Sequence, residues 1–380
     1  MDLSPSGEQQ LIVDAASAFL AERASSAATR AAMASASGID ASLWREIGAM
    51  GWCGVHLGEA IGGMGLGLVE LVLLQEQLGR RLACVPYFDS VVRAGTLLVD
   101  LLGDADAASV IGTTLAALGC GDLVAGVASL DAEDGAQATA TAQPGGWTLD
   151  GDWPRVGSAA AADRLLLVAR GPGDESLLFL CAPRGAGIEV RPLETIDRTR
   201  RVAAVSARAA SLPAVACIAR GARLDAALAR LRCVAAIALA AEQLGSAQQC
   251  LDLSAAYLGE RVQFDRPLAS FQAVKHRCAQ MAVAVECARS AVYGAACAAA
   301  AAPDDAATLE FEAALARCEA TEASQFCAQE AIQLHGGVGY TWDCDAQLHF
   351  KRAQASSQRL GATGAWLDAV ARRLIDGVPA

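Results

Sequence analysis

The chain has 380 residues, of which 54% are hydrophobic and 19% charged, a balance typical of globular proteins and not of disordered ones. This length exceeds what one hydrophobic core usually organises, so we expect two or three domains. The formal net charge of −12 argues against the basic surface that nucleic acids and anionic membranes require, and neither is expected as a partner.

The first five residues lack the basic and apolar regions of a secretory signal. The most apolar stretch, Cys233 to Ala241, is shorter than the roughly 20 residues that cross a bilayer. We therefore expect a cytoplasmic protein. The thirteen cysteines include no C-x-x-C pair, so small buried thiols are expected and neither a disulfide framework nor a metal site is.

Helical patterns fill the first third of the chain. Ser6 to Gln9 matches a capping box before a helically spaced apolar run, and further helices are expected around 43–47 and over 68–82. The glycine-rich run Gly62 to Gly67 lies between them. A dinucleotide-binding loop would follow a strand, and only helical patterns surround this run, which favours an interhelical loop.

Near Gly121 the pattern changes to short β-like runs separated by Gly, Pro and Asp. Asp150-Gly151 suits a type I′ turn and predicts a hairpin over 147–153. The β-like runs predict an antiparallel β-domain, and they lie at 123–128, 165–169, 177–182, 188–192 and 202–206.

After Leu212-Pro213 the patterns are helical again. Asp225 to about Arg261 contains no proline and would form one helix about 54 Å long. The alanine run 298–302 is expected to end a helix, with Pro303-Asp304-Asp305 capping the next. The predicted class is α+β, with an N-terminal helical domain (1–120), a middle antiparallel β-domain (121–215) and a C-terminal helical domain (216–380).

Glu242 is the only charged side chain between Arg232 and Asp252. Small residues dominate its helical face, so a substrate has room to approach. Burial raises the pKa of a carboxyl group and strengthens the carboxylate as a base. The spacing leaves two other interpretations open: a Glu paired with a basic residue of another helix, or one that faces a solvent channel.

Two polar clusters follow. In 260–276 an arginine and glutamines near a helix end suit a pyrophosphate, although a polar corner between helices has the same composition. In 333–343 three glycines after a helix permit close backbone approach, or simply end the helix.

Together the two clusters resemble a known family. Arg261-Val-Gln-Phe-Asp-Arg-Pro-Leu, followed by Phe-Gln and Lys-His, resembles the acyl-CoA dehydrogenase motif R-x-Q-F-G-x-P-I…F-Q…H. Gln333-Leu-His-Gly-Gly-Val-Gly-Tyr resembles its companion Q-x-H-G-G-x-G-[FY], in the same order. The segment from Leu43 to Gly65 is similar to the family's pocket-side segment, so the resemblance spans almost the whole chain.

The resemblance implies that the C-terminal domain is a four-helix bundle and that the three domains enclose FAD and an acyl-CoA. A carboxylate would remove the α-proton while the β-hydride passes to the flavin, which an electron-transfer flavoprotein reoxidises. Some flavin contacts would reach a neighbouring subunit, which implies a homo- or hetero-oligomer. The residues expected to contact FAD are Arg261, Gln263, Phe264, Gln272, Gln333 and Gly337.

Many family members carry the base late in the chain, but 354–363 contains no acid here. A minority place it on the long helix before R-x-Q-F. Glu242, within Ala-Ala-Glu-Gln-Leu-Gly, is similar to the bacterial branch that degrades sterols and unusual acyl groups. Glu242 is therefore the predicted catalytic base, and Asp343 is taken as structural.

The chain departs from the family where the flavin ring is normally held. Ser129-Leu130-Asp131 replaces T-E-P…G-S-D, Arg155-Val156-Gly157 replaces W-I-T, and Asp265 replaces a glycine. A weak grip on flavin suits an α2β2 heteromer, in which two different subunits share each flavin. Two alternatives to an active dehydrogenase follow: a non-catalytic or half-site partner subunit, or a related flavoenzyme that uses oxygen.

Overall fold

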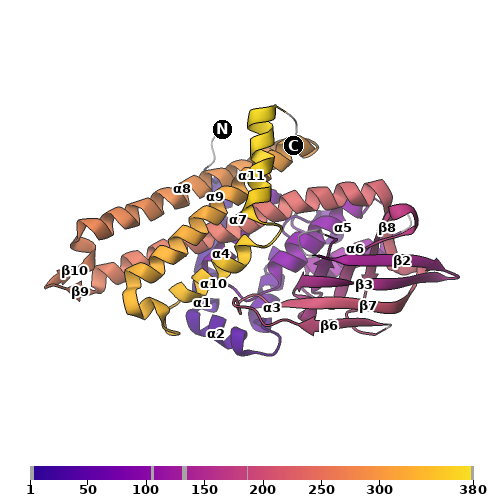
Figure 1. Cartoon of the computed structure of the whole chain (residues 1–380), viewed down its shortest axis with the longest axis horizontal. Coiled ribbons are helices and arrows are strands. Elements are labelled where there is room, and N and C mark those ends of the chain that lie inside the picture. The colour runs from indigo at the N-terminus through magenta and orange to yellow at the C-terminus, as the bar shows by residue number, and fades with distance from the viewer. Residues whose placement is uncertain (1–3, 104–106, 131–134, 186, 378–380) are drawn as a thin grey trace. The chain divides into compact units, whose positions relative to one another are not determined.

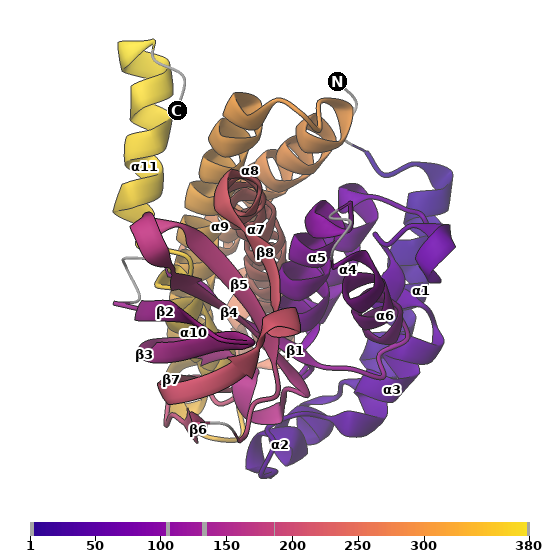
Figure 2. The ribbon, with the colours of Figure 1, turned by 90° about the vertical axis from the view of Figure 1, so that its right-hand side faces the viewer.

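The computed structural model describes residues 4–103, 107–130, 135–185 and 187–377. Helices come first, a β-sheet follows, and long helices complete the chain (Figures 1 and 2), which confirms the predicted α+β class. Contacts divide the chain into two compact units, a bundle unit (1–30, 68–83 and 236–380) and a sheet unit (31–67 and 84–235). The predicted N-terminal domain is thus shared between them, and the three domain boundaries stay a prediction.

The sheet unit contains an eight-stranded sheet in the order β6-β7-β3-β2-β4-β5-β8, with β1 beside β4. Its strands are β1 (Ala125–Ala128), β2 (Gln137–Gln143), β3 (Gly146–Gly157), β4 (Arg164–Arg170), β5 (Ser176–Cys181), β6 (Ile188–Pro192), β7 (Val202–Pro213) and β8 (Cys217–Arg220). Its helices are α3 (Ala41–Ala49), the π-helix η3 (Phe88–Gly95), α5 (Thr96–Leu101) and α6 (Ala108–Gly119).

The sheet differs from the prediction in two respects. It is mixed, because β1 and β2 both pair with β4 in the parallel sense while the other pairs are antiparallel. A strand, β8, also stands between Pro213 and the next helix, where the sequence predicted an immediate return to helix.

The predicted Asp150-Gly151 turn is wrong. Both residues lie inside β3, and the β2–β3 hairpin turns at Pro144-Gly145, where Gly145 has a φ of 83°. Gly151 is needed for close packing, since a Cβ there would lie 2.4 Å from Cα of Ala138. The pairing of β3 with β7 also shifts register beside Gly151, as at a bulge.

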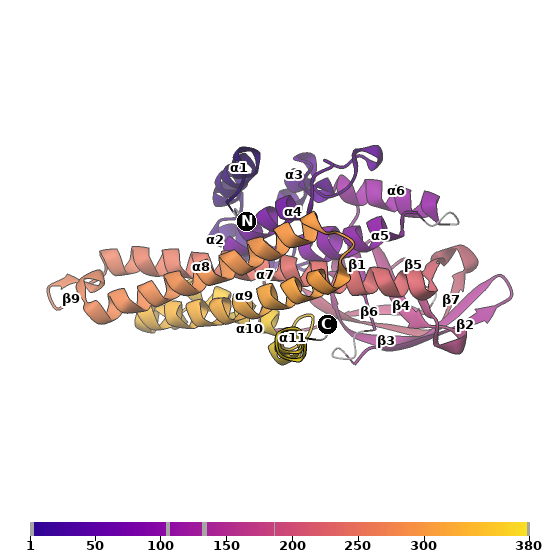
Figure 3. The ribbon, with the colours of Figure 1, turned by 90° about the horizontal axis from the view of Figure 1, so that it is seen from above.

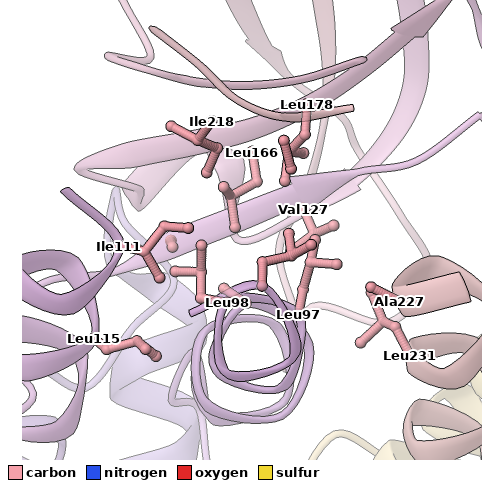
Figure 4. Packing of buried hydrophobic residues seen from close by; sticks show 14 of the residues in the cluster. Leu97, Leu98, Ile111, Leu115, Val127, Leu166, Leu178, Ile218, Ala227 and Leu231 are labelled. Atoms are coloured by element: carbon pink, nitrogen blue, oxygen red, sulfur yellow. The ribbon is translucent and has the colours of Figure 1, made fainter. Parts of the chain in front are cut away.

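The core of the sheet unit lies between α5, α6 and one face of the sheet (Figure 4). Leu97 and Leu98 of α5 point toward Val127, Leu166 and Leu178 of the strands, and all are at most 2% exposed. Burying a leucine side chain stabilises a fold by about 1.5–3 kcal/mol, so this cluster anchors the helices to the strands.

The bundle unit consists mainly of long helices. They are α1 (Gly7–Arg23), α4 (Leu68–Arg80), α8 (Gln272–Ala301), α9 (Ala306–His335), α10 (Ala346–Ser357), α11 (Thr363–Ala371) with the π-turn Arg372–Asp376, and the larger part of α7 (Gly221–Glu260); α2 (Ser26–Ala34) runs from this unit into the sheet unit. Figure 3 shows α8 and α9 side by side, and the short β9–β10 hairpin (Val262–Gln263 and Arg266–Pro267) joins α7 to α8.

Several predicted helix boundaries are confirmed. Ser6 and Gln9 form the capping box of α1. The predicted long helix is α7, one helix of 40 residues. Asp305 caps α9 by accepting from the backbone N–H of Thr308 at 3.0 Å. The glycine-rich run Gly62 to Gly67 is a loop between the short helix Glu59–Ile61 and α4, as predicted.

Within the described residues, α8 is long and apolar enough to span a membrane, judged by length and composition alone. The sequence prediction did not include such a segment. Core helices of globular proteins meet the same test. α8 packs along α9 and α4, and its Arg289 forms an ion pair with Glu76 of α4, as expected of a bundle helix.

Candidate active site

Glu242 lies on α7 where that helix crosses α4, and it is 4% exposed. Two glycines allow the crossing. A Cβ at Gly79 would lie 2.2 Å from the backbone oxygen of Glu242, and a Cβ at Gly245 would lie 2.0 Å from that of Glu76. The backbones of α4 and α7 therefore approach closely at Glu242 itself and at Gly245, and this packing fixes the backbone position of Glu242.

The two carboxylate oxygens of Glu242 have different partners. Arg352 of α10 donates from Nη1 to Oε1 at 3.0 Å, and Gln75 of α4 donates from Nε2 to Oε2 at 3.0 Å. The structure thus contains the pair with a basic residue of another helix that the sequence left open, and it places the carboxylate away from solvent. The role of Glu242 as the base stays a prediction.

A second contact holds α10 against α7, one helical turn from the ion pair. Ser246 Oγ and His349 Nδ1 share a hydrogen bond of 2.7 Å. Burial lowers the pKa of His349 to about 4, so its imidazole is neutral near pH 7. His349 therefore adds no positive charge beside Arg352 near pH 7.

A second buried carboxylate, Glu76, lies next to Gln75 on α4, and the sequence analysis missed it. It accepts from Arg289 Nη1 and from the Tyr293 hydroxyl, both at 2.7 Å. Burial, and then the negative charge of Glu76, raises the pKa of Tyr293. Burial alone would lower the pKa of Arg289, but Glu76 more than reverses this effect. As a second buried carboxylate at the α4–α7 crossing, Glu76 is the alternative candidate for the base.

Gln75 and Arg352 were not predicted as site residues from the sequence either. One signal was present for Gln75: Gln75-Glu76-Gln77 is a polar run in the middle of the otherwise apolar segment 71–78. All three residues are at most 5% exposed. Arg352 gives no such signal, because its segment is rich in polar residues and its partner lies 110 positions away.

Gly245→Ala is expected to destabilise the protein by about 1–3 kcal/mol, because the added methyl group meets backbone that cannot yield without moving α4. The matched control is Gly259→Ala on the same helix, where a Cβ meets nothing within 4 Å. That control should be neutral or stabilising by up to about 1 kcal/mol. Denaturant unfolding measures both, and equal midpoints would refute the close crossing.

The six residues predicted to contact FAD gather at one end of the bundle. Arg261, Gln263 and Phe264 lie on the hairpin after α7, and Gln272 begins α8. Gln333 lies in the last turn of α9, and Gly337 follows that helix. His335 stacks on Tyr257 at 4.5 Å between ring centroids, which joins the end of α9 to the last turn of α7. All six are exposed, and we call this end of the bundle the tip.

The tip fits a ligand that carries phosphate. The first backbone N–H groups of α8 receive no side-chain cap, and a helix N-terminus attracts anions. A Cβ at Gly337 would meet nothing within 4 Å, so the backbone there is open to close approach. Phe264 and Asp265 both have positive φ values, 53° and 60°. Asp265 thus occupies a left-handed position that favours glycine, which accounts for the glycine of the family motif.

In the two segments of the sheet unit that replace the family's ring-holding motifs, the described contacts are made to the chain's own side chains. Gly157 stands where the family motif has threonine, and a Cβ there would lie 2.3 Å from Asp89 Oδ2. Ser158 Oγ donates to the same oxygen at 2.9 Å. At the end of β1, Arg93 donates to Val127 O at 3.0 Å and to Ser129 Oγ at 3.2 Å. Asp131 lies outside the described residues.

These contacts form a buried network of the chain's own side chains at the ends of β1 and β3. Asp89 is 1% and Arg93 7% exposed. The residues present therefore fit one part of an FAD site, at the tip, and do not fit the part that the sheet unit would contribute through these two segments.

Helices, a sheet and then a long-helix bundle with an exposed motif-bearing tip define the acyl-CoA dehydrogenase class of fold. The family model described as acyl-CoA dehydrogenase, N-terminal domain, matches residues 6–106, and that described as acyl-CoA dehydrogenase, C-terminal domain, matches residues 224–375. The chain belongs to the acyl-CoA dehydrogenase family.

Among its relatives is the acyl-CoA dehydrogenase IpdE2 of Mycobacterium tuberculosis, 34% identical over 94% of each chain. Among solved structures, a variant of the Tcur3481–Tcur3483 steroid ACAD is 32% identical, with a TM-score of 0.84 over 98% of this chain and 99% of that one. The ChsE4–ChsE5 complex of Mycobacterium tuberculosis contains a chain that is 27% identical, with a TM-score of 0.88 over 100% of both.

Proposed function

We propose that this protein oxidises an acyl-CoA thioester at Cα–Cβ with FAD, and that Glu242 removes the α-proton. The observation that carries the proposal is the position of Glu242. It is buried in an otherwise uncharged stretch of α7, held between Gln75 and Arg352, where two glycines let α7 cross α4 closely. This carboxylate is not a solvated surface charge. The free-energy cost of removing it from water must be offset by specific partners.

A bound flavin would supply the acceptor for the β-hydride. The chain's own residues contribute the rest. Glu242 takes the α-proton, Gln75 and Arg352 orient its carboxylate, and the rigid α4–α7 crossing excludes water around it. Arg261, Gln272 and the open backbone at Gly337 would hold the phosphate-bearing part of the cofactor.

The acyl group is proposed to be bulky. The support for this is that one similar solved structure, 32% identical to this chain, is named a steroid ACAD. The electron acceptor is proposed to be an electron-transfer flavoprotein.

The test is anaerobic bleaching of the flavin by CoA thioesters of graded size, from butanoyl-CoA to ring-bearing acyl-CoAs. The flavin-loaded protein should bleach, and fastest with the larger thioesters. The absence of bleaching with every thioester would overturn the proposal. Reoxidation by air that is as fast as reoxidation by an electron-transfer flavoprotein would instead favour an oxygen-using enzyme.

A second candidate, a half-site subunit in a heteromer, is favoured by the network at Asp89, Arg93 and Ser158. If the sheet unit does not hold the ring, the exposed tip can still complete a flavin site on a different chain. Two similar structures carry names of two-component proteins, Tcur3481–Tcur3483 and ChsE4–ChsE5. The dehydrogenase activity proposed above would then belong to the assembled complex.

A further inference from the structure

The surroundings of the Glu242 carboxylate are asymmetric. Oε1 is bound by a guanidinium, which carries a permanent positive charge, whereas Oε2 is bound by a neutral amide. Arg352 and Glu242 are both nearly excluded from water, with side-chain exposures of 5% and 6%. Separating this buried pair would break a contact between two opposite charges held away from water, whereas moving Gln75 would cost one hydrogen bond to a neutral amide.

Gln75 has a spare hydrogen-bonding group. Its Nε2 donates to Glu242, and its Oε1 is buried without a hydrogen-bond partner. An amide has a donor end and an acceptor end that exchange places when the side chain rotates by half a turn. Gln75 can therefore donate to a carboxylate and, after that rotation, accept from a protonated carboxyl group. No single orientation of the amide satisfies both states of Glu242, so the rotation must accompany protonation.

We propose that Arg352 is a positioning residue that holds Glu242 ionised through Oε1, so that Oε2 is the atom that takes the proton and Gln75 turns to accept the new O–H. This inference rests on the proposed role of Glu242. In the step, the Cα–H bond of the acyl group breaks and its electron pair stays on the thioester. The proton forms an O–H bond at Oε2, and the charge of Arg352 stays on the protein.

The arrangement has a consequence for pH dependence. A neighbouring positive charge favours the ionised form of a carboxyl group, so Arg352 keeps Glu242 ready as a base at lower pH. Other ionisable groups lie nearby: His349 is neutral, Arg81 and Asp345 act on His349 with opposite signs, and Arg289 is engaged by Glu76. Removing the guanidinium should therefore shift the acid limb of the pH profile, in which the rate of proton abstraction falls as Glu242 becomes protonated, to higher pH.

The test is exchange of the acyl α-hydrogen with D2O, which reports proton abstraction without hydride transfer. The flavin-loaded protein, with its partner subunit if one is required, is incubated with the best-bleaching CoA thioester between pH 5 and 9, and deuterium is read by mass spectrometry. Arg352→Gln should move the acid limb upward by at least one pH unit, and Arg352→Lys should restore it. Arg289→Gln, which removes the same group from the neighbouring carboxylate Glu76, should leave the limb in place.

A second readout needs no substrate. With glutamate labelled by carbon-13 at Cδ, the signal lost in Glu242→Gln identifies Glu242, and its titration in Arg352→Gln should move upward in pH relative to the parent. If Arg352→Gln does not fold, Arg352→Lys decides, because it should titrate like the parent. An unchanged limb and titration in Arg352→Gln would overturn the proposal. Exchange that persists in Glu242→Gln would instead overturn the role of Glu242 itself.

Discussion

Glu242→Gln is expected to fold like the parent and to reduce its flavin about 10²–10⁴ times more slowly with acyl-CoA, the range that a general base contributes. Glutamine has the same shape, and its amide oxygen can still accept from Arg352, so the α4–α7 crossing should survive. It cannot take a proton from carbon. Anaerobic rapid mixing, with flavin absorbance as the signal, measures the rate.

Two controls make this result specific. Glu286→Gln removes a carboxylate from α8 that is 67% exposed, and it should leave the rate unchanged. Glu76→Gln removes the other buried carboxylate at the crossing. If Glu76→Gln, and not Glu242→Gln, abolishes reduction, then Glu76 is the base and the assignment made here is wrong.

The second large effect concerns cofactor content. Purified alone, the chain is expected to hold well under one flavin per subunit. The reason is that Asp89 and Arg93 contact the ends of β3 and β1, where the family's ring-holding motifs would lie. Purified with a second acyl-CoA dehydrogenase-type chain that binds it, the complex should hold flavin in a fixed ratio to the pair. Absorbance of the released flavin against protein concentration gives the ratio. Full occupancy and turnover from the single chain would contradict the half-site candidate.

The tip should contribute to that shared site. Arg261→Ala is expected to lower flavin retention by the complex, because it removes the charge on the proposed phosphate side. Arg277→Ala, on the first turns of α8 and paired with Glu330 at 3.1 Å, is the control. It should leave flavin content unchanged while altering a similarly exposed arginine.

Local patterns predicted those parts of the fold that local interactions determine. The Ser6 capping box, the long helix α7 and the Asp305 cap each depend on residues a few positions apart, and each is confirmed. The Asp150-Gly151 turn failed because glycine has more than one use in a sheet. Here it accommodates the close approach of Ala138 from β2, a contact that no local pattern reveals.

The candidate site shows the same limit. The isolation of Glu242 within α7 was visible in the sequence, and so were the motif residues at the tip. The partners of the carboxylate were not, because Gln75 and Arg352 are brought to it from 167 and 110 positions away by the packing of α4 and α10. The network of Asp89 with Ser158 is likewise formed by tertiary packing, across 69 positions.

The proposed activity depends most on one buried carboxylate that abstracts the α-proton of a CoA thioester. Deuterium uptake at the acyl α-carbon in D2O, compared between the parent and Glu242→Gln in the flavin-loaded protein, tests that step directly. We expect uptake with the parent and none above the uncatalysed background with Glu242→Gln. Equal uptake by the two proteins would show that another group removes the proton.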